Sequence, residues 1–229
     1  MAEFLLVCGG VICLIVPIVL FGILPLVDTL RGRNAHSRLS ESGDYQLLHD
    51  APRAVNKIFG GEAQGKGFAF RPSAERYTSY NSGGRTRTMV HFHLQIIMPI
   101  YNQNLSGLVL SQTRKLNSIT ETFNEIWKAK PSADLLSIDQ QSALVRFVAE
   151  KTHPSGIYGG RIKFRSFMRQ LNIIDRSKWS QSLPAEIFPD ATAVLVYDHP
   201  KANIDLQTFE SLLDELLNLS IVLEDSSQK

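Results

Sequence analysis

The feature that most constrains this chain is an uncharged, strongly apolar segment near its N-terminus, Phe4 to Val27. An α-helix rises about 1.5 Å per residue, so a helix over this segment is long enough to cross a hydrocarbon core of about 30 Å. Such a helix also satisfies its own backbone hydrogen bonds, as lipid requires. Pro17 and Pro25 lie inside the segment, and proline is tolerated in membrane helices. The sequence therefore predicts a single transmembrane anchor within residues 1–30.

A cleaved signal peptide is the alternative interpretation of the same segment. Signal peptides combine a basic start, a shorter apolar run and a small-x-small cleavage site. The residues before Phe4 include no lysine or arginine, the apolar run is long, and no Ala-x-Ala pattern follows Val27. We therefore expect the anchor to be retained.

The cations that flank the segment predict its orientation. Arg31, Arg33 and Arg38 follow it, whereas no lysine or arginine precedes it. Because loops rich in lysine and arginine stay on the cytoplasmic side, we expect the N-terminus outside and the C-terminal part in the cytoplasm. Both cysteines, Cys8 and Cys13, fall inside the anchor, so no disulfide framework holds the rest of the chain together.

The rest of the chain divides into a tether and one domain. Glycine, serine and charged residues dominate residues 31–43, which is typical of a polar linker. The remaining residues, 44–229, are enough for one domain with a proper core.

Alternation of apolar and polar residues predicts strands after Gly67. The clearest strand ends at Pro99 and places five apolar residues on one face: Val90, Phe92, Leu94, Ile96 and Met98. Turn residues at 81–84 precede it, and strand-like runs lie on either side. We therefore predict a three-stranded antiparallel meander over residues 67–112.

Helical periodicity and capping residues then predict a mixed architecture. The further predicted elements are helices over Ser118–Trp127, from Ser137 to about Lys151 and from Asp205 to Leu223, and strands over Gly159–Phe167 and Ala193–Tyr197. Ser137 and Gln140 have the spacing of a capping box. This order of elements favours an α+β fold, in which a mainly antiparallel sheet packs on helices.

Charge is segregated along the chain. Residues 53–115 carry nine lysines or arginines against two acids, whereas residues 180–229 carry nine acids against two lysines. A basic sheet face suits anionic lipid head groups or a protein partner, since each cation near an anionic leaflet contributes about 1 kcal/mol. The candidate contact residues are Arg85, Arg87, Arg161, Lys163 and Arg165. The alternative is that the acidic C-terminal helix packs near the basic strands and neutralises them. We expect no nucleic-acid partner.

Two motifs suggest chemistry and are outweighed by simpler interpretations. Residues 60–67 nearly match a phosphate-binding loop, but Gly67 replaces the Mg²⁺-binding Ser or Thr, and a strand-like run follows where a helix should begin. We interpret them as a glycine turn. His91 and His93 share one strand face and could reach one metal, but no third ligand is near in sequence. We expect a half-exposed polar face there, and no metal or other cofactor. Asp198 and His199 are interpreted as a turn after a strand.

These observations favour a non-catalytic interaction or accessory module held at the cytoplasmic face of a membrane, with the lipid bilayer contacted through residues 4–27. The alternative is a membrane-tethered metal-dependent or hydrolytic enzyme that uses His91 and His93, with His199 as a further member. A third hypothesis is a homo-oligomer formed through the anchor, where Gly9 and Cys13 have small-x-x-x-small spacing.

Overall fold

The computed structural model describes residues 39–51, 57–80, 86–112, 122–151, 171–179, 183–199 and 202–225. The predicted anchor over residues 4–27 and the predicted strand over residues 159–167 lie outside these ranges. Among the helices in the described ranges, none is both long and apolar enough to cross a membrane.

The described residues form an α+β domain around one sheet, as the sequence predicts. The sheet has eight strands in the order β1-β2-β3-β4-β8-β7-β5-β6, and every recorded pairing is antiparallel. The strands are β1 (Gln46–His49), β2 (Ile58–Ala63), β3 (Lys66–Tyr80), β4 (Thr86–Ile100), β5 (Val109–Gln112), β6 (Trp127–Lys130), β7 (Leu171–Asp175) and β8 (Ala193–His199).

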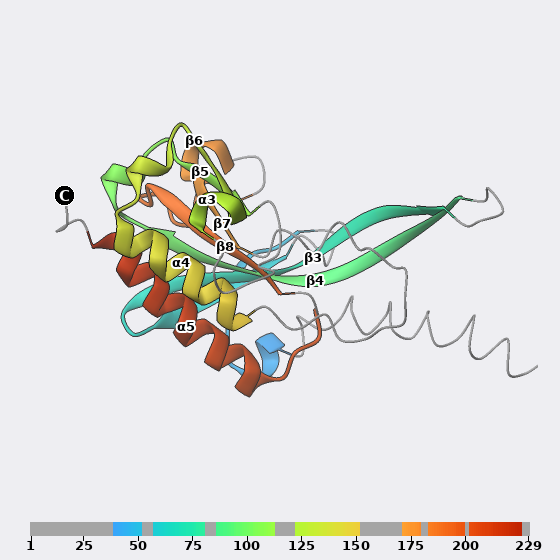
Figure 1. Cartoon of the computed structure of the whole chain (residues 1–229). Helices are drawn as coiled ribbons and strands as arrows, with labels where there is room; N and C mark the ends of the chain where they lie inside the picture. The colour runs from blue at the N-terminus through green and yellow to red at the C-terminus, as the bar shows by residue number, and fades with distance from the viewer. Residues whose placement is uncertain are drawn as a thin grey trace, which may run out of the picture.

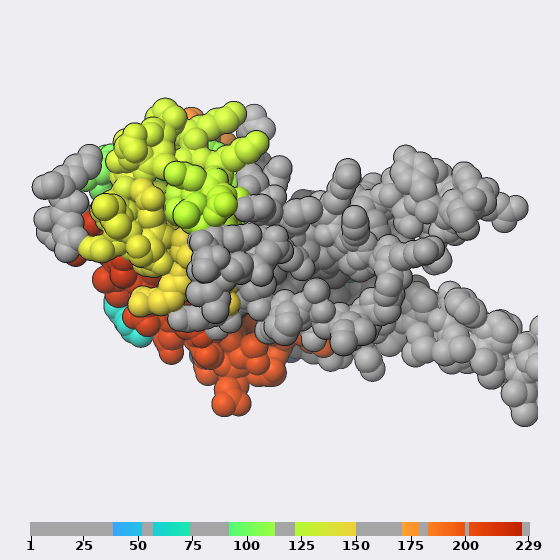
Figure 2. All heavy atoms as spheres, viewed as in Figure 1, coloured from blue at the N-terminus to red at the C-terminus, as the bar shows by residue number. Residues whose placement is uncertain are grey.

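The helices cover one face of this sheet (Figure 1). They are α3 (Phe123–Ile126), α4 (Ile138–Lys151) and α5 (Leu206–Glu224), with short 3-10 turns η3 (Gln103–Leu105), η4 (Ala133–Leu135) and η6 (Arg176–Trp179). Figure 2 shows the residues of α3, α4 and α5 as one continuous surface. The predicted cap of α5 is confirmed, because the Asp205 carboxylate accepts a hydrogen bond from the Thr208 backbone amide at 2.8 Å.

The main core lies between the helices and the sheet. On β4 the predicted face is buried, since Leu94, Ile96 and Met98 are fully buried against the helical layer. A cluster of aromatic rings fills the β3 side of this core, where Phe209 of α5 lies 5.0 Å from Phe70 between ring centroids. Alternate strand residues on the opposite face pack with Leu183 and Ile187, from the segment before β8, in a smaller core. Its strand residues are Ile58, Ala69, Ile97, Val194 and Val196.

The predicted meander is only half right. β3 and β4 form the expected hairpin, but β5 pairs with β6 and β7 instead of β4. The neighbour of β4 is β8, which the chain reaches about a hundred residues later. The first five residues of β8 are all buried, and a strand with two buried faces suits a central position.

Pro99 does not end its strand, contrary to the prediction. It lies inside β4 and pairs with Val194 of β8. The pairing of β3 with β4 stops at Ile97, so the recorded ladder has β8 as the neighbour of Pro99. Proline is tolerated where one side of a strand needs no backbone N–H.

The helix predicted over Ser118–Trp127 is confirmed in its described part only for Phe123–Ile126, and Trp127 departs from it. Residues 113–121 lie outside the described ranges, and α3 is a single turn. Trp127 instead begins β6 opposite Gln112, where its indole is buried and stacks on Phe123 at 5.1 Å. Burial of this large side chain in the sheet outweighs helical periodicity.

The glycine-rich segment is a hairpin, as the turn interpretation predicts. It spans the end of β2 and the start of β3, and Gln64 and Gly65 form the tip with φ of +53° and +76°. Two successive positive φ angles are typical of a two-residue hairpin turn. Inside the predicted linker, residues 31–43, Leu39 is buried in the main core.

Candidate functional site

A row of polar side chains crosses the face of the sheet opposite the helices. Arg71 of β3, Gln95 of β4 and Asp198 of β8 are successive partners across the strands. Arg71 Nε donates to Gln95 Oε1 at 2.8 Å, and Gln95 Nε2 donates to Asp198 Oδ1 at 2.9 Å. His93 Nε2 lies 3.3 Å from the same carboxylate oxygen. We call Arg71, His93, Gln95 and Asp198 the polar row.

The polar row is largely shielded from water and carries opposite charges. The side chains of His93 and Asp198 are 15% and 23% exposed. Burial lowers the pKa of Arg71, and the negative charge of Asp198 opposes that effect. A glutamine links the two charges, so each polar group has a partner and the row ties three strands together.

Within the described residues, the polar row lies where the sheet narrows to two strands. β2 pairs with β3 only as far as Phe70, and β8 pairs with β4 only from Leu94. From Ser73 opposite His93 to Tyr80 opposite Thr86, the two strands continue as eight further residue pairs. We call residues 73–80 and 86–93 the ribbon. Figure 1 shows β3 and β4 running beyond the rest of the sheet.

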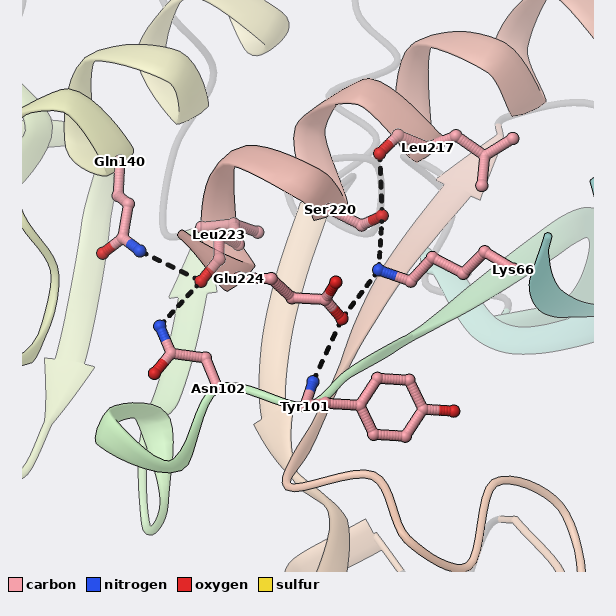
Figure 3. A network of polar contacts seen from close by, with 8 residues as sticks. All are labelled: Lys66, Tyr101, Asn102, Gln140, Leu217, Ser220, Leu223 and Glu224. Carbon is pink, nitrogen blue, oxygen red and sulfur yellow. Dashed lines mark hydrogen bonds and ion pairs between the residues drawn. The ribbon is translucent and has the colours of Figure 1, made fainter. Parts of the chain in front are cut away.

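A second polar cluster holds the C-terminal end of α5 on the sheet (Figure 3). The Leu223 carbonyl accepts hydrogen bonds from Asn102 Nδ2 at 2.9 Å and from Gln140 Nε2 at 3.0 Å. Gln140 also closes the predicted capping box, since its Oε1 accepts from the Ser137 backbone amide at 2.9 Å. One buried side chain therefore caps the start of α4 and the end of α5.

The adjacent turn of α5 is held by charge. Lys66 Nζ lies 2.7 Å from Glu224 Oε1 and donates to Ser220 Oγ at 3.0 Å. Glu224 also accepts from the Tyr101 backbone amide at 3.1 Å. Lys66 comes from the glycine-rich hairpin, so the lysine that resembles a phosphate ligand in sequence is bound to a carboxylate of α5. This contact agrees with the alternative that the acidic helix neutralises nearby basic residues.

The structure does not assemble the three predicted histidines. His93 and His199 lie on opposite faces, because His199 pairs with Leu94 and its ring lies 6.4 Å from Tyr197 in the main core. The backbone of His91 pairs with Glu75 in the ribbon, and its side chain lies outside the described part. Within the described residues, no three metal-ligating side chains gather.

The candidate contact residues are mostly not placed. Arg85, Arg161, Lys163 and Arg165 lie outside the described residues. The backbone of Arg87 lies in the ribbon, opposite Ser79.

Sequence reasoning missed most of the polar row. Asp198 was expected in a turn but lies inside β8, where register places it beside Gln95. A signal was present, because an aspartate that follows five apolar strand residues must find a polar partner if the strand continues. Arg71 carries a similar signal, since it follows the apolar run Phe68–Phe70.

Comparison of the chain with protein-family models, with curated proteins and with solved structures finds no match. The functional argument therefore rests on the residues and the geometry described above.

Proposed function

We propose that this chain is a non-catalytic interaction module, anchored in a membrane through residues 4–27 and held at its cytoplasmic face. We further propose that the ribbon is the part of the domain that contacts a partner protein.

The observation that carries this proposal is the length of the ribbon. Its eight residue pairs lie beyond the recorded pairings of β2 and β8. A strand edge of this kind offers backbone N–H and C=O groups as a template for another strand. A two-stranded ribbon is also only marginally stable in water, so a partner that covers it would stabilise it.

The chemistry of the ribbon suits an extended protein segment. Its sequence is rich in threonine, tyrosine and other residues that favour strands, and its charged residues are Glu75, Arg76 and Arg87. Addition of a strand from a partner would take its affinity from main-chain hydrogen bonds and its specificity from alternate side chains. The predicted anchor would place this edge close to other membrane proteins.

Site-specific photo-crosslinking in the native cell tests the ribbon. A photo-reactive residue at Tyr80 is expected to give a discrete crosslinked partner, whereas the same residue at Ile138, which is 82% exposed on α4, is expected to give none of that species. Replacing residues 76–90 with Asn-Gly joins the natural pair Glu75 and His91 by a two-residue turn. The crosslinked species should then no longer co-purify. Equal crosslinking from both sites, or a partner retained by the shortened ribbon, contradicts the proposal.

Cysteine labelling tests the membrane orientation. In a chain with Cys8 and Cys13 changed to serine, a cysteine at Ser142 on α4 is the single thiol, because the sequence has no other cysteine. A membrane-impermeant maleimide is expected to label it only after the cells are permeabilised. Labelling of intact cells would contradict the cytoplasmic placement.

Metal analysis tests the enzymatic alternative. The purified full chain is expected to contain no stoichiometric zinc. Stoichiometric zinc that disappears when His91 and His93 are changed to alanine would favour the metal-dependent enzyme over the interaction module.

A further inference from the structure

One end of the sheet carries two exposed lysines that form no ion pair with a described residue. β6 is the last strand of the sheet (Figure 1), and Lys128 and Lys130 are its exposed residues. The ion pairs of the described residues include neither of them. By contrast, Lys57 and Lys66, on the β2 and β3 side of the sheet, each lie against a carboxylate.

Strand register places both lysines on the face of the sheet opposite the helices. Trp127 and Ala129, which alternate with them along β6, pack in the main core between sheet and helices. Because successive side chains of a strand point to opposite faces, the two lysines point away from the helices. Their partners on β5, Ser111 and Val109, are uncharged.

The carboxylates nearest to these lysines in the sheet and in the sequence are held by other groups. Asp175, the one acid of β5, β6 and β7, pairs with a main-core residue of β8 and accepts hydrogen bonds from three backbone amides. Glu125 accepts from the Thr122 amide at 2.7 Å, and Asp134 accepts from the Ser132 hydroxyl at 2.8 Å. None of the three forms an ion pair with a lysine of β6.

A third lysine adds its charge at the same end of the sheet. Lys178 of η6 donates from Nζ to the Gly107 carbonyl at 2.9 Å, on the surface. Gly107 lies two residues before Val109, the partner of Lys130. A carbonyl accepts the hydrogen bond but does not neutralise the ammonium charge. We call Lys128, Lys130 and Lys178 the lysine edge.

We propose that the lysine edge contacts the anionic lipid head groups of the membrane in which the chain is anchored. The inference rests on the proposed anchor, which keeps the domain close to one leaflet. Each lysine near an anionic leaflet is expected to raise the ratio of membrane-apposed to free domain about fivefold. Tethering raises the effective concentration of the surface, so an attraction of this size is sufficient to orient the domain.

The position of the lysines favours a lipid surface over an extended peptide. Lysines on an edge strand discourage pairing with a further strand. The lysine edge therefore suits a partner that offers negative charge without competing for the backbone of β6. Lipid phosphates and carboxylates at a leaflet surface meet that requirement.

Energy transfer to the lipid surface tests the contact in the full chain, reconstituted in vesicles with an acceptor dye on their head groups. With Cys8 and Cys13 changed to serine, a donor dye is attached at Ser106→Cys, exposed next to Gly107, or at Asn218→Cys, on the exposed side of α5. Adding phosphatidylserine to phosphatidylcholine vesicles is expected to raise transfer from the first position and not from the second. High salt should reverse this rise, because salt screens exposed charges.

Charge-removing variants assign the rise to the lysine edge. Lys128→Gln combined with Lys130→Gln should lower the ratio of membrane-apposed to free domain about 25-fold and so remove most of the rise. Arg146→Gln is the matched control, because Arg146 is also exposed and forms no ion pair with a described residue, but lies on α4. It should leave the rise intact. The fluorescence of Trp127, buried between the helices and the sheet, checks that each variant folds. A rise that survives the double substitution, or that disappears in Arg146→Gln, would overturn the proposal.

Flotation of the same vesicles separates this inference from the anchor on which it rests. A chain that floats with both kinds of vesicle, but shows no rise with phosphatidylserine or an equal rise from both dye positions, overturns the lysine edge and not the anchor. A chain that floats only with phosphatidylserine vesicles, and no longer does so after the double substitution, supports the lysine edge and contradicts the anchor. A chain that floats with neither contradicts both.

Discussion

Alanine substitution of Asn102 and Gln140, singly and together, tests how the last turn of α5 is held. Both side chains are nearly buried, at 7% and 4% exposure, and both donate to the carbonyl of Leu223. Each also has a second role. Asn102 accepts from the Asn104 backbone amide at 3.0 Å, and Gln140 accepts from the Ser137 amide at 2.9 Å.

The expected losses can be worked out from these contacts. Asn102→Ala removes two hydrogen bonds of about 1 kcal/mol and should lower the free energy of unfolding by about 2 kcal/mol. Gln140→Ala should cost at least as much, because its amide also donates to the carbonyls of Val222 and Asp225 at 3.4 and 3.3 Å. In either single variant the Leu223 carbonyl keeps one donor. In the double variant it loses both, and an unsatisfied buried acceptor costs about 1–3 kcal/mol. We therefore expect the double variant to lose about 1 kcal/mol more than the sum of the two single losses.

Urea unfolding of the full chain in a mild detergent measures these losses. The fluorescence of Trp127, which is 2% exposed, reports on the packing of the helical layer. Gln207→Ala, on the exposed side of α5, is the matched control and should change stability by less than about 0.5 kcal/mol. Additive losses in the double variant would refute the shared carbonyl as the source of coupling. Single losses no larger than that of the control would refute the role of both side chains.

Three further predictions use the same unfolding assay. Lys66→Met should lower the free energy of unfolding by about 2 kcal/mol, because the ion pair of Lys66 with Glu224 is largely buried. Lys57→Met removes an exposed ion pair with Asp50 and should leave the urea midpoint unchanged. Equal effects of the two substitutions would contradict this. Burial raises the pKa of Asp175, but hydrogen bonds from Ser177 and nearby backbone amides outweigh it and leave the pKa below its ordinary value of 3.8. The stability from this carboxylate is therefore present above that value and lost as pH falls through the lower folded pKa. The free energy of unfolding of Asp175→Asn should differ most from that of the unsubstituted chain near pH 7. A difference that stays constant down to pH 2 would refute this. Phe209→Ala should cost about 3–5 kcal/mol, because the ring is fully buried among other aromatic rings; a loss below about 1 kcal/mol would contradict that packing.

Local patterns predicted local structure well. The alternation in β4 and the apolar stripe and capping aspartate of α5 are properties of neighbouring residues, and both elements form as expected. The capping box of Ser137 and Gln140 is a four-residue pattern and also forms. The local sequence pattern does not predict which strands pair with each other in the sheet. The placement of β8 beside β4 depends on burial of both faces of β8 by segments far away in the chain.

The same limit applies to the polar row. The sequence identified His93 and its polar strand face. Which side chains meet on that face depends on the register of three strands, and no local pattern specifies that register. Asp198 becomes a partner of His93 only when β8 runs antiparallel to β4. The ion-pair partner of Lys66 similarly lies in α5, a helix that begins about 140 residues later.

The position of β8 in the sheet has a consequence for biosynthesis. β4 is complete at Ile100, but the strand that joins it to β7 is not made until residues 193–199. At translation rates of about 5–20 residues per second, the edge of β4 waits for roughly 5 to 20 s without its native neighbour. Non-local pairing of this kind also folds slowly once the chain is complete. A nascent chain stalled before Ala193 therefore carries two half-sheets with open edges, and this is the stage at which the protein most needs protection from aggregation.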